Sequence, residues 1–325
     1  MRRDRSLMPF KSLTDKLIQF APPEQKVALA VSGGGDSVAM LHLALEVLPV
    51  EKLVVFHVNH GLRAEASGEA KFVEDLCAMN NVSFYKRELS HLSKGQANLQ
   101  ARGRASRYES FKEMAEEASV QHIWLAHTQD DVAETFLMRL NKGAGVKGLS
   151  AMAESFERYG LSFARPLLDV SRNELREYLA SGPYKWCEDP SNEDDSFLRI
   201  KMRKFIQCSE NNVLNSDSLV ASAHSVARAN DALEQWTEQF WKASVSHMKA
   251  ECTFHMNEFL ELPLEIQFRV IDKCVNWGGE PYPPRTEKKQ RLIEALSIGK
   301  TKRTLGGIVF ESNEYGICTI SRENG

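Results

Sequence analysis

Short apolar runs and segments of helical periodicity alternate through the first half of the chain. The apolar runs predict strands over residues 26–32, 52–59, 82–89 and 122–127. The segments between them predict helices over residues 36–48, 64–79 and 98–118. Strands and helices that alternate at this spacing form βαβ units, so the first half predicts a doubly wound parallel sheet with helices on both faces.

The second half of the chain has a different pattern. Residues 186–204 are polar, turn-rich and strongly charged, which predicts an exposed loop. Helices are predicted broadly over residues 218–245, 264–277 and 284–298. The segments TLGGIVF and GICTIS predict the two strands of a closing hairpin, joined by ESNEY.

These patterns predict three domains in an α/β protein. An α/β domain is expected over residues 1–205, and a helical middle domain or linker over residues 206–255. A small α+β module is expected over residues 256–325.

The composition indicates the class of protein and where in the cell it is expected. The 325 residues are 42% hydrophobic and 26% charged, as in an ordinary globular protein. No apolar stretch reaches the 18–20 residues of a membrane span, and the first residues lack the apolar core of a secretory signal. The six cysteines lie far apart without a C-x-x-C pair, which favours reduced thiols in the cytoplasm. We therefore expect a cytoplasmic protein without a membrane partner.

The formal net charge of -3 gives no overall attraction for nucleic acid. A nucleic-acid partner would have to bind local basic clusters, which occur at residues 199–204, 284–291 and 299–303. Solvated helix faces and loops are the alternative interpretation of each cluster.

The string LAVSGGGDSVAML carries the first candidate chemistry, because its glycines lie between a predicted strand and a predicted helix. Backbone amides and a helix N-terminus in this context bind phosphate, and serine hydroxyls add donors. The residues concerned are Ser32, Gly33, Gly34, Gly35, Asp36 and Ser37.

The glycine loop lacks the lysine that a Walker loop uses for γ-phosphoryl transfer. We therefore expect it to hold pyrophosphate as a leaving group, while Asp36 helps to hold Mg²⁺. That chemistry implies attack at the α-phosphate of ATP and an adenylated intermediate. The S-G-G-x-D-S string resembles the PP-loop ATP pyrophosphatases, a family of adenylating enzymes with a doubly wound sheet.

Further motifs fall near the same predicted sheet edge. HVNHGLR places His57 and Arg63 after the second strand, at the carboxyl edge where such sheets bind ligands. LQARGRASRY places Arg102, Arg104 and Arg107 on one helix, where surface ion pairing is the alternative role.

An acidic group follows the fourth strand. Asp130, Asp131 and Glu134 gather at the start of one predicted helix, just after His127. Acids in a first turn often serve only as helix caps. At the same sheet edge as the glycine loop, they instead predict a nest for a metal or an amine.

These strings, together with ARPLL and WCEDPSNEDDSFLR, closely resemble the tRNA(Ile)-lysidine synthetase family over about residues 25–205. The resemblance implies an enzyme that uses ATP and Mg²⁺ to activate C2 of the wobble cytidine in an isoleucine tRNA with a CAU anticodon. The ε-amine of free L-lysine then displaces AMP and leaves lysidine, changing the codon from AUG to AUA and the identity from Met to Ile. A homodimer is compatible with the sequence, which does not set the number of copies.

Roles for single residues follow from the motifs and the resemblance together. The catalytic residues expected are Asp36, Asp130, Asp131 and Glu134, with Asp36 as the metal ligand. ATP is expected to contact the glycine-loop residues Ser32, Gly33, Gly34, Gly35, Asp36 and Ser37, and also His57, Arg107 and His127. Lysine is expected at Asp131, Glu134 and Arg199. The expected tRNA contacts are Arg63, Arg102, Arg104, Arg203, Lys288, Lys289, Lys302 and Arg303.

Two features depart from the family pattern: Ile200 stands where many members have Asn, and longer members continue after the closing hairpin.

Three other functions compete with this interpretation. The tRNA-thiolating PP-loop enzymes need a cysteine for persulfide sulfur or a cysteine-held cluster, and only Cys187 lies near a site motif. NAD synthetase shares the loop but has no evident need for the EDPSN segment and the basic tail. A non-catalytic nucleotide- or RNA-binding protein would not need the intact acids.

Overall fold

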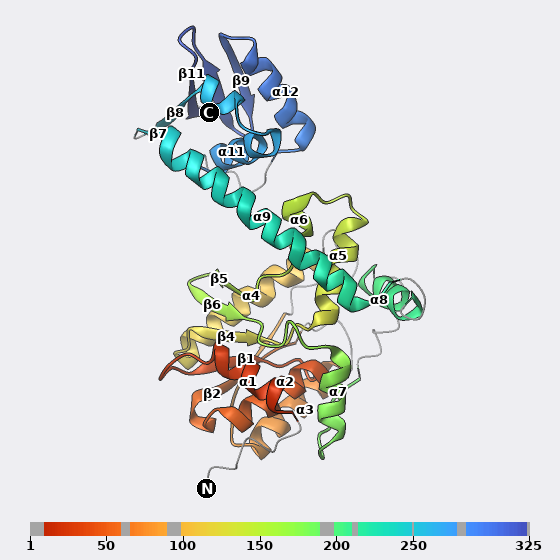
Figure 1. Ribbon diagram of the computed structural model, residues 1–325. Helices are drawn as coiled ribbons and strands as arrows, with labels where there is room; N and C mark the ends of the chain where they lie inside the picture. The colour runs from red at the N-terminus through yellow and green to blue at the C-terminus, as the bar shows by residue number, and fades with distance from the viewer. Residues whose placement is uncertain are drawn as a thin grey trace. The chain divides into compact units, whose positions relative to one another are not determined.

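The computed structural model describes residues 10–59, 66–89, 99–188, 198–209, 214–248, 250–277 and 284–323. The chain divides into two compact units, Met1–His224 and Ser225–Gly325 (Figure 1). The boundary falls within the long helix α9 (Ser216–Ser244), which agrees with the helix predicted over residues 218–245.

The first unit is built on a six-stranded sheet with the order β3-β2-β1-β4-β6-β5. Its strands are β1 (Val27–Ala30), β2 (Leu53–Asn59), β3 (Ser83–Glu88), β4 (His122–Leu125), β5 (Ser155–Arg158) and β6 (Leu161–Ala164). All neighbours pair in parallel except β5 and β6, which are antiparallel. The predicted parallel α/β sheet is therefore confirmed, while the edge hairpin β5–β6 was not predicted.

Alternate residues of the central strands face two different cores. Val27 and Leu29 of β1 belong to a core with helices α1 (Lys11–Phe20), α2 (Gly35–Val47), α3 (Ala66–Met79) and α7 (Arg172–Ala180). Ala28 faces the opposite core, where Phe56 packs with α4 (Leu99–Ala118). Helices on both faces explain why these strands are apolar without alternation.

The chain changes direction across the sheet between β1 and β4. From β1 it passes through α2 to β2 and through α3 to β3, and α4 then leads on the other face to β4. Doubly wound sheets bind ligands at the carboxyl ends of the strands where this reversal occurs. The glycine loop follows β1 and the acidic helix α5 (Gln129–Leu140) follows β4, so both lie at the reversal.

The remaining helices of this unit are α6 (Val146–Leu149), α8 (Leu198–Ser209) and the short 3-10 helix η2 (Val50–Lys52). The prediction of an exposed loop over residues 186–204 is wrong for its last part, because residues 198–204 are helical. Ile206 of α8 packs in a core with Val132 and Ala133 of α5, and this burial stabilises a helix whose charged residues suggested a loop.

The second unit has a five-stranded antiparallel sheet with the order β7-β8-β11-β10-β9. Its strands are β7 (Ser246–His247), β8 (Glu251–His255), β9 (Thr301–Leu305), β10 (Ile308–Ser312) and β11 (Ile317–Arg322). Its helices are α10 (Met256–Leu260), α11 (Leu264–Trp277) and α12 (Thr286–Ser297). The hairpin between β10 and β11 and the helices α11 and α12 are confirmed.

One detail of the predicted hairpin is wrong. TLGGIVF is not a single strand, because Gly306 and Gly307 have positive φ angles of 58° and 67° and form a turn between β9 and β10. Two adjacent positive φ angles favour glycine at both positions and are typical of a tight hairpin turn.

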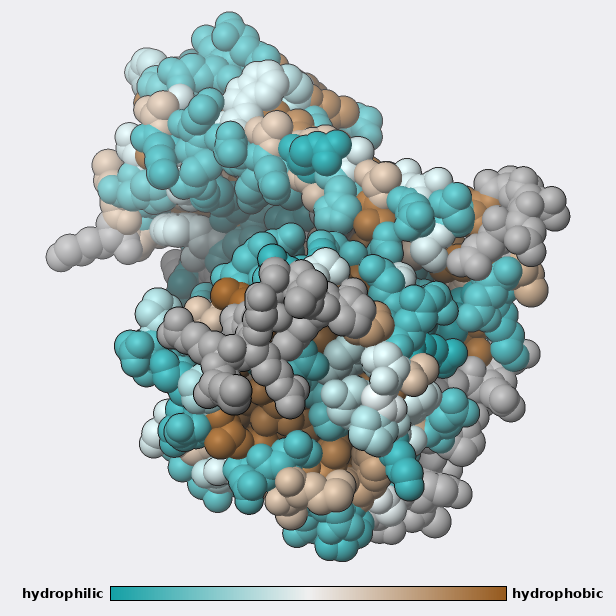
Figure 2. All heavy atoms as spheres, turned by 60° about the horizontal axis from the view of Figure 1, so that its bottom comes forward, coloured by the Kyte–Doolittle hydropathy of each residue, from teal (hydrophilic) through white to brown (hydrophobic). Residues whose placement is uncertain are grey.

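Hydrophilic side chains dominate the face of the protein seen in Figure 2, with smaller hydrophobic areas between them. Within the described part of the chain, no helix combines the length and apolar character that crossing a bilayer requires.

Candidate active site

The glycine loop is held in shape by the two serines that flank it. Gly33 adopts a positive φ of 101°, which favours glycine. The Ser37 hydroxyl donates to the Gly34 carbonyl at 2.8 Å, and the Gly34 N–H donates to the Ser32 hydroxyl at 3.3 Å. Gly34 is the N-cap of α2, so the loop ends on the positive end of a helix. This is the geometry expected of a phosphate-binding loop.

His57 braces the strand that leads into the loop. It is buried at the end of β2, and its Nδ1 donates to the Val31 carbonyl at 2.9 Å, since a carbonyl can only accept. Burial lowers its pKa, although the bond to Val31 opposes this shift, so the ring is neutral. His57 therefore supports the loop, and its expected contact with ATP stays a prediction.

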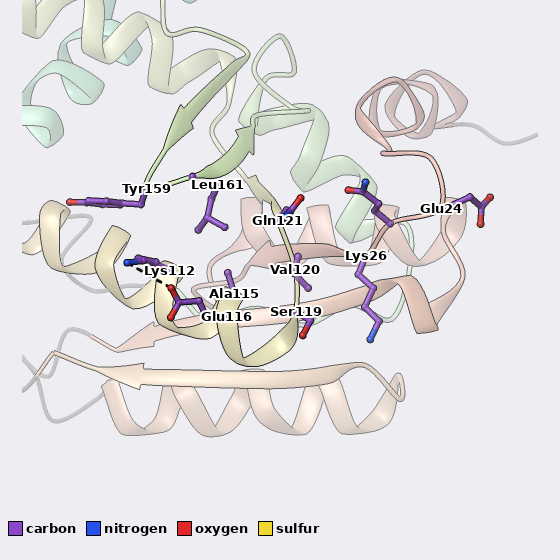
Figure 3. A pocket seen from close by; sticks show the side chains of 12 residues that line it. Glu24, Lys26, Lys112, Ala115, Glu116, Ser119, Val120, Gln121, Tyr159 and Leu161 are labelled. Atoms are coloured by element: carbon purple, nitrogen blue, oxygen red, sulfur yellow. Dashed lines mark ion pairs between the residues drawn. The ribbon is translucent and has the colours of Figure 1, made fainter.

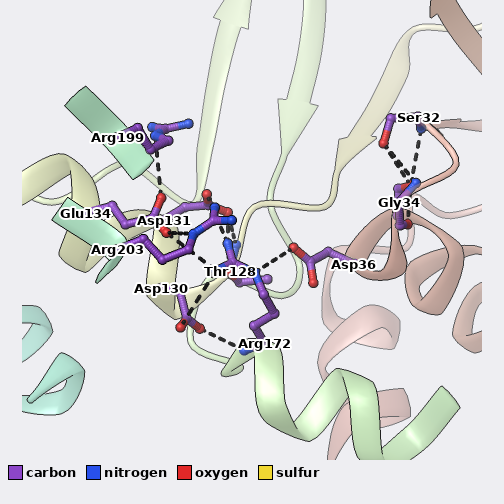
Figure 4. A network of polar contacts seen from close by, with 11 residues as sticks. Ser32, Gly34, Asp36, Thr128, Asp130, Asp131, Glu134, Arg172, Arg199 and Arg203 are labelled. Atoms are coloured by element: carbon purple, nitrogen blue, oxygen red, sulfur yellow. Dashed lines mark hydrogen bonds and ion pairs between the residues drawn. The ribbon is translucent and has the colours of Figure 1, made fainter. Parts of the chain in front are cut away.

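A single guanidinium joins the loop to the acidic helix. Arg172 of α7 lies 3.2 Å through Nε from Asp36, and its Nη2 lies 3.6 Å from Asp131 (Figure 4). Its Nη1 lies 3.4 Å from Glu134 and 3.9 Å from Asp130. Burial opposes the charge of Arg172, but the surrounding carboxylates raise its pKa above the ordinary value. The four predicted acids are thus brought together around one cation.

Two of these acids also stabilise helix starts. One oxygen of Asp131 accepts from the Thr128 N–H at 2.9 Å and from its hydroxyl at 3.2 Å, as in a capping box of α5. Asp130 accepts from the backbone N–H of Arg172 at 2.7 Å. Burial opposes ionisation of Asp131, but Arg172, His127 and the Thr128 N–H together lower its pKa. The capping role and the role in the cluster therefore coexist.

Glu134 makes no helix-capping bond. It is 1% exposed, and Arg203 donates to its Oε1 at 2.7 Å. Arg199 lies 3.5 Å from Oε2 and donates to the Thr135 hydroxyl at 3.1 Å. The Oε2 atom is buried and has no hydrogen-bond partner among the described residues. An unsatisfied buried carboxylate oxygen is costly, so it favours a ligand that donates to it.

Asp36 fits a metal that arrives with a nucleotide. It lies in the first turn of α2 and keeps part of its side chain exposed, while burial raises its pKa despite Arg172. The described residues contain no group of three His, Cys, Asp or Glu side chains suited to a metal ion. Mg²⁺ is commonly held by one or two carboxylates together with substrate phosphates, which one carboxylate beside a phosphate loop can supply.

His127, after β4, lies between the acids and a group of arginines. Its Nδ1 accepts from Arg165 Nε at 3.2 Å, so its proton is on Nε2. Burial lowers the pKa of His127 to about 4, although Asp131 opposes the shift. Arg165 lies close enough to Arg107 for their charges to interact. Arg107, like His127, is a residue for which the sequence predicted a contact with ATP.

Comparison with known proteins places the chain in a family. Residues 8–209 match the model of the PP-loop domain. The tRNA(Ile)-lysidine synthase of Ruegeria pomeroyi is 38% identical over 292 residues, which cover 88% of this chain and 69% of that protein. The synthase of Rhodopseudomonas palustris is 38% identical over 284 residues, covering 85% of this chain and 82% of that protein. The chain belongs to the tRNA(Ile)-lysidine synthase family.

A solved structure supports the fold of this family member. The U34-tRNA thiolase NcsA from Methanococcus maripaludis, solved with its [4Fe-4S] cluster, has a TM-score of 0.54 to this chain. It is 19% identical and covers 69% of this chain and 78% of its own, so the likeness shows the fold alone.

The residues expected to contact tRNA lie in different settings in this family member. Arg102 and Arg104 are exposed on α4, whereas Arg203 is bonded to Glu134 within the acidic cluster. Arg63 lies outside the described residues.

In the second unit, Lys288, Lys302 and Arg303 are exposed, and Lys302 pairs with Glu311 at 2.8 Å. Lys289 is buried, lies 2.9 Å from Asp272 and packs over the Phe268 ring. A buried, paired lysine is a structural cation, so we leave Lys289 out of the proposed tRNA contacts.

Sequence reasoning missed three residues of the site. Arg172 had no signal, because α7 was not predicted and nothing marks one arginine as buried among acids. Arg165 lies within the ARPLL string, but the string by itself indicates no role for it. Trp186 packs near Gly35, where an added Cβ would lie 3.5 Å from its ring.

A pocket at the other edge of the sheet is not this site. It is lined by residues such as Lys26, Gln121 and Leu161, which lie just before or at the start of their strands, and by the paired Lys112 and Glu116 (Figure 3). Doubly wound sheets bind their ligands at the carboxyl ends instead. The glycine loop and the acids lie at the carboxyl ends of the strands, so we place the active site there and not in this pocket.

Proposed function

We propose that this protein ligates free lysine to C2 of the wobble cytidine in an isoleucine tRNA with a CAU anticodon, using ATP. In the first step the cytidine O2 attacks the α-phosphate of ATP, and pyrophosphate leaves. In the second step the ε-amine of lysine attacks C2 and loses a proton, and AMP leaves with O2. The product, lysidine, pairs with A, which changes the codon from AUG to AUA.

The glycine loop suits the first step. The backbone amides of its glycines, which no side chain covers, and the start of α2 would hold the pyrophosphate portion of ATP. Ser32 and Ser37 would be further donors. Asp36 would hold Mg²⁺, which supplies charge stabilisation at the phosphates when bound. The predicted contacts of His57 and His127 with ATP belong to the same proposal.

The observation that carries the second step is the buried Oε2 of Glu134, which lies 3.5 Å from Arg199 and has no hydrogen-bond partner among the described residues. Four carboxylates surround Arg172, and Arg199 and Arg203 add two more guanidiniums, so these seven described side chains carry one net negative charge. Free lysine has one net positive charge at neutral pH and can donate to that oxygen. Asp131 and Glu134 would hold the side-chain amine, and an acid of the cluster would take its proton.

Sulfur transfer is less well supported. Cys187 donates its backbone N–H to the Gly33 carbonyl at 2.9 Å, so a thiol does lie beside the loop. It is a free cysteine, and burial raises its pKa, which disfavours the thiolate that sulfur chemistry needs. Lysine ligation makes use of the acids, whereas sulfur transfer does not explain them.

Product analysis tests the proposal. The protein is incubated with the tRNA transcript, ATP, Mg²⁺ and lysine, each omitted in turn, and nucleosides and nucleotides are analysed by mass spectrometry. We expect equal amounts of AMP, pyrophosphate and a cytidine derivative heavier by lysine minus water, and none of this derivative without lysine. Formation of thiolated nucleoside, or of ADP and phosphate, would refute the proposal.

A further inference from the structure

Four guanidiniums come from α4, α5 and the end of β6, and the charge of Arg104 acts on each of the other three. Arg104 and Arg107 lie on α4, with their Cζ atoms 5.4 and 5.8 Å from the centre of the Tyr108 ring. Arg165 follows β6, and Arg139 lies in the last turn of α5. We call these four residues the arginine cluster.

Neutral groups hold the arginine cluster in place. Arg104 donates to the Tyr108 hydroxyl at 3.4 Å, and Arg139 donates to the Ser150 carbonyl at 2.8 Å. Arg165 donates to the Ala153 carbonyl and to His127. The side chains are therefore oriented before any ligand binds, which lowers the entropic cost of binding one.

The arginine cluster has no acidic partner within the part of the chain that the structure describes. Among the described residues, no carboxylate lies within ion-pair distance of any of the four, whereas Arg172, Arg199, Arg203 and Arg87 are all paired with acids. The Nε atom of Arg107 is buried and has no hydrogen-bond partner in the described part of the chain.

Like charges held together at a partly buried position destabilise the free protein. Burial lowers the pKa of Arg107, Arg139 and Arg165, and the charge of Arg104 lowers each of them further. Anions bound beside these side chains would reduce this repulsion, and one beside Arg107 could accept a hydrogen bond from its Nε atom. Guanidiniums bind phosphates with two parallel bonds, which makes a phosphate the anion that fits best.

We infer that the arginine cluster binds backbone phosphates of the RNA substrate next to the reacting cytidine, an inference that rests on the proposed function. Contacts of this kind position a nucleic acid without reading its bases. The inference gives Arg139 and Arg165 a role in RNA binding and moves Arg107 from the ATP contact expected from the sequence to RNA. It keeps Arg104 as an RNA contact, within a defined group of arginines.

The position of the cluster favours RNA over the phosphates of ATP. The glycine loop follows β1, whereas Arg165 follows β6, two strands away or about 10 Å at the usual strand spacing. Arg139 lies eleven residues beyond Thr128, a rise of about 16 Å along the axis of α5. A triphosphate held by the glycine loop would not extend along all of these arginines, whereas a polynucleotide backbone can.

Two variants that neutralise one charge each test the inference. Arg104→Gln removes an exposed member of the cluster. Arg87→Gln is the control, because Arg87 also contacts helix α4 but is paired there with Glu113 and Glu117. Affinity for the tRNA transcript is measured without ATP or lysine over a series of salt concentrations, and the melting temperature of each free variant is recorded.

For Arg104→Gln we expect weaker tRNA binding, and a log–log salt slope that is smaller by about 0.7–0.9, because one phosphate is no longer neutralised. Its melting temperature should equal or exceed that of the wild type, because repulsion is relieved. Arg87→Gln should keep the wild-type affinity and slope. Arg139→Gln provides a second member variant and should repeat the decrease in affinity and slope.

Unchanged tRNA affinity and slope in both member variants would overturn the inference. So would a decrease in ATP affinity with tRNA binding intact, which would assign the cluster to the nucleotide. Because the assay needs no ligation, a wild-type protein that binds the tRNA but forms no lysidine would refute the proposed function and leave this inference standing.

Discussion

A guanidinium from α7 lies between the carboxylate that follows β1 and those that follow β4. The sequence predicted the acids, because their spacing places them in one helical turn after a strand. It did not predict Arg172, since its partners come from positions 36 to 134 and only the tertiary fold brings them together. Residues close together in a motif can be predicted to share a site from the sequence. A charged partner that comes from a distant element, such as Arg172, cannot.

Replacing Arg172 by Gln should lower the free energy of unfolding by about 3 kcal/mol at pH 7, since it leaves buried carboxylates without their partner. Asp131 has a lowered pKa in the folded state, so its contribution is present above its unfolded pKa and is lost as the pH falls through the folded value. The difference between variant and wild type should therefore shrink below about pH 4. Urea unfolding at pH 7 and pH 3.5 measures it, with Arg172→Lys expected to retain part of the stability. A difference that is the same at both pH values would show that the acids do not depend on Arg172.

His127 should make the protein less stable at mildly acidic pH. Its folded pKa of about 4 lies below the ordinary 6.5, so the unfolded chain binds a proton that the folded protein does not between these values. Stability should fall by up to about 3 kcal/mol as the pH drops from 7 to 4, and His127→Gln should remove that part of the fall. Urea unfolding over this pH range is the measurement, with His122→Gln as the control. Parallel pH profiles for wild type and His127→Gln would contradict the lowered pKa.

At the scale of elements, patterns of apolar residues predicted the central strands β1 to β4 and most of the long helices. They failed where burial depends on a distant partner: α8 has a charged sequence and is fixed by packing against α5, and β5 is a partly exposed edge strand paired only with β6. Helix α7 begins with a capping box of Ser171 and Glu174, which fixes where Arg172 starts the helix. The capping box thus helps to fix the position of Arg172 among the four carboxylates.

Ser171→Ala should therefore lower stability by about 1 kcal/mol, as expected for the removal of an N-cap. It should also reduce the rate of lysidine formation less than Arg172→Gln does, because the guanidinium remains but the start of its helix is less well fixed. Thermal unfolding and single-turnover ligation measure the two effects. Ser181→Ala, at the other end of α7, is the control, and equal decreases in both variants would argue against a role of the cap in placing Arg172.

At the scale of the whole molecule, the chain consists of two units, each with its own sheet and core. The chemistry proposed here uses only the first unit, while the second unit has exposed cations that include Lys288, Lys302 and Arg303. With a net charge of -3, attraction for tRNA must come from such local contacts. Neither the position of the domain boundary within α9 nor the burial of Lys289 could be predicted from composition, because both depend on packing.

Neutralising Lys288, Lys302 and Arg303 together should weaken tRNA binding and reduce its salt slope by about 0.7–0.9 for each phosphate that these cations neutralise. The single-turnover rate at saturating tRNA should change little, because these side chains belong to the other unit. A control that changes Lys289 to Met should affect stability rather than affinity, since that lysine is buried and paired with Asp272. An unchanged salt slope in the triple variant would exclude this surface as a tRNA-binding surface.

In the proposed site, ATP binds at the end of β1 and lysine binds at the end of β4. This separation of the two substrates along one sheet edge is the division of labour tested here. The most direct test compares the KM values of Glu134→Gln for the two substrates, with Glu177→Gln on α7 as the control. Removal of a charged acceptor should raise the KM for lysine about tenfold or more and leave the KM for ATP within about twofold, since such a bond contributes about 1.5–3 kcal/mol. Asp36→Asn should show the opposite pattern, with AMP formation slowed on the order of 10²–10³-fold and little change in the KM for lysine. Equal effects of Glu134→Gln on both substrates, in a variant that is folded, would contradict the division of labour.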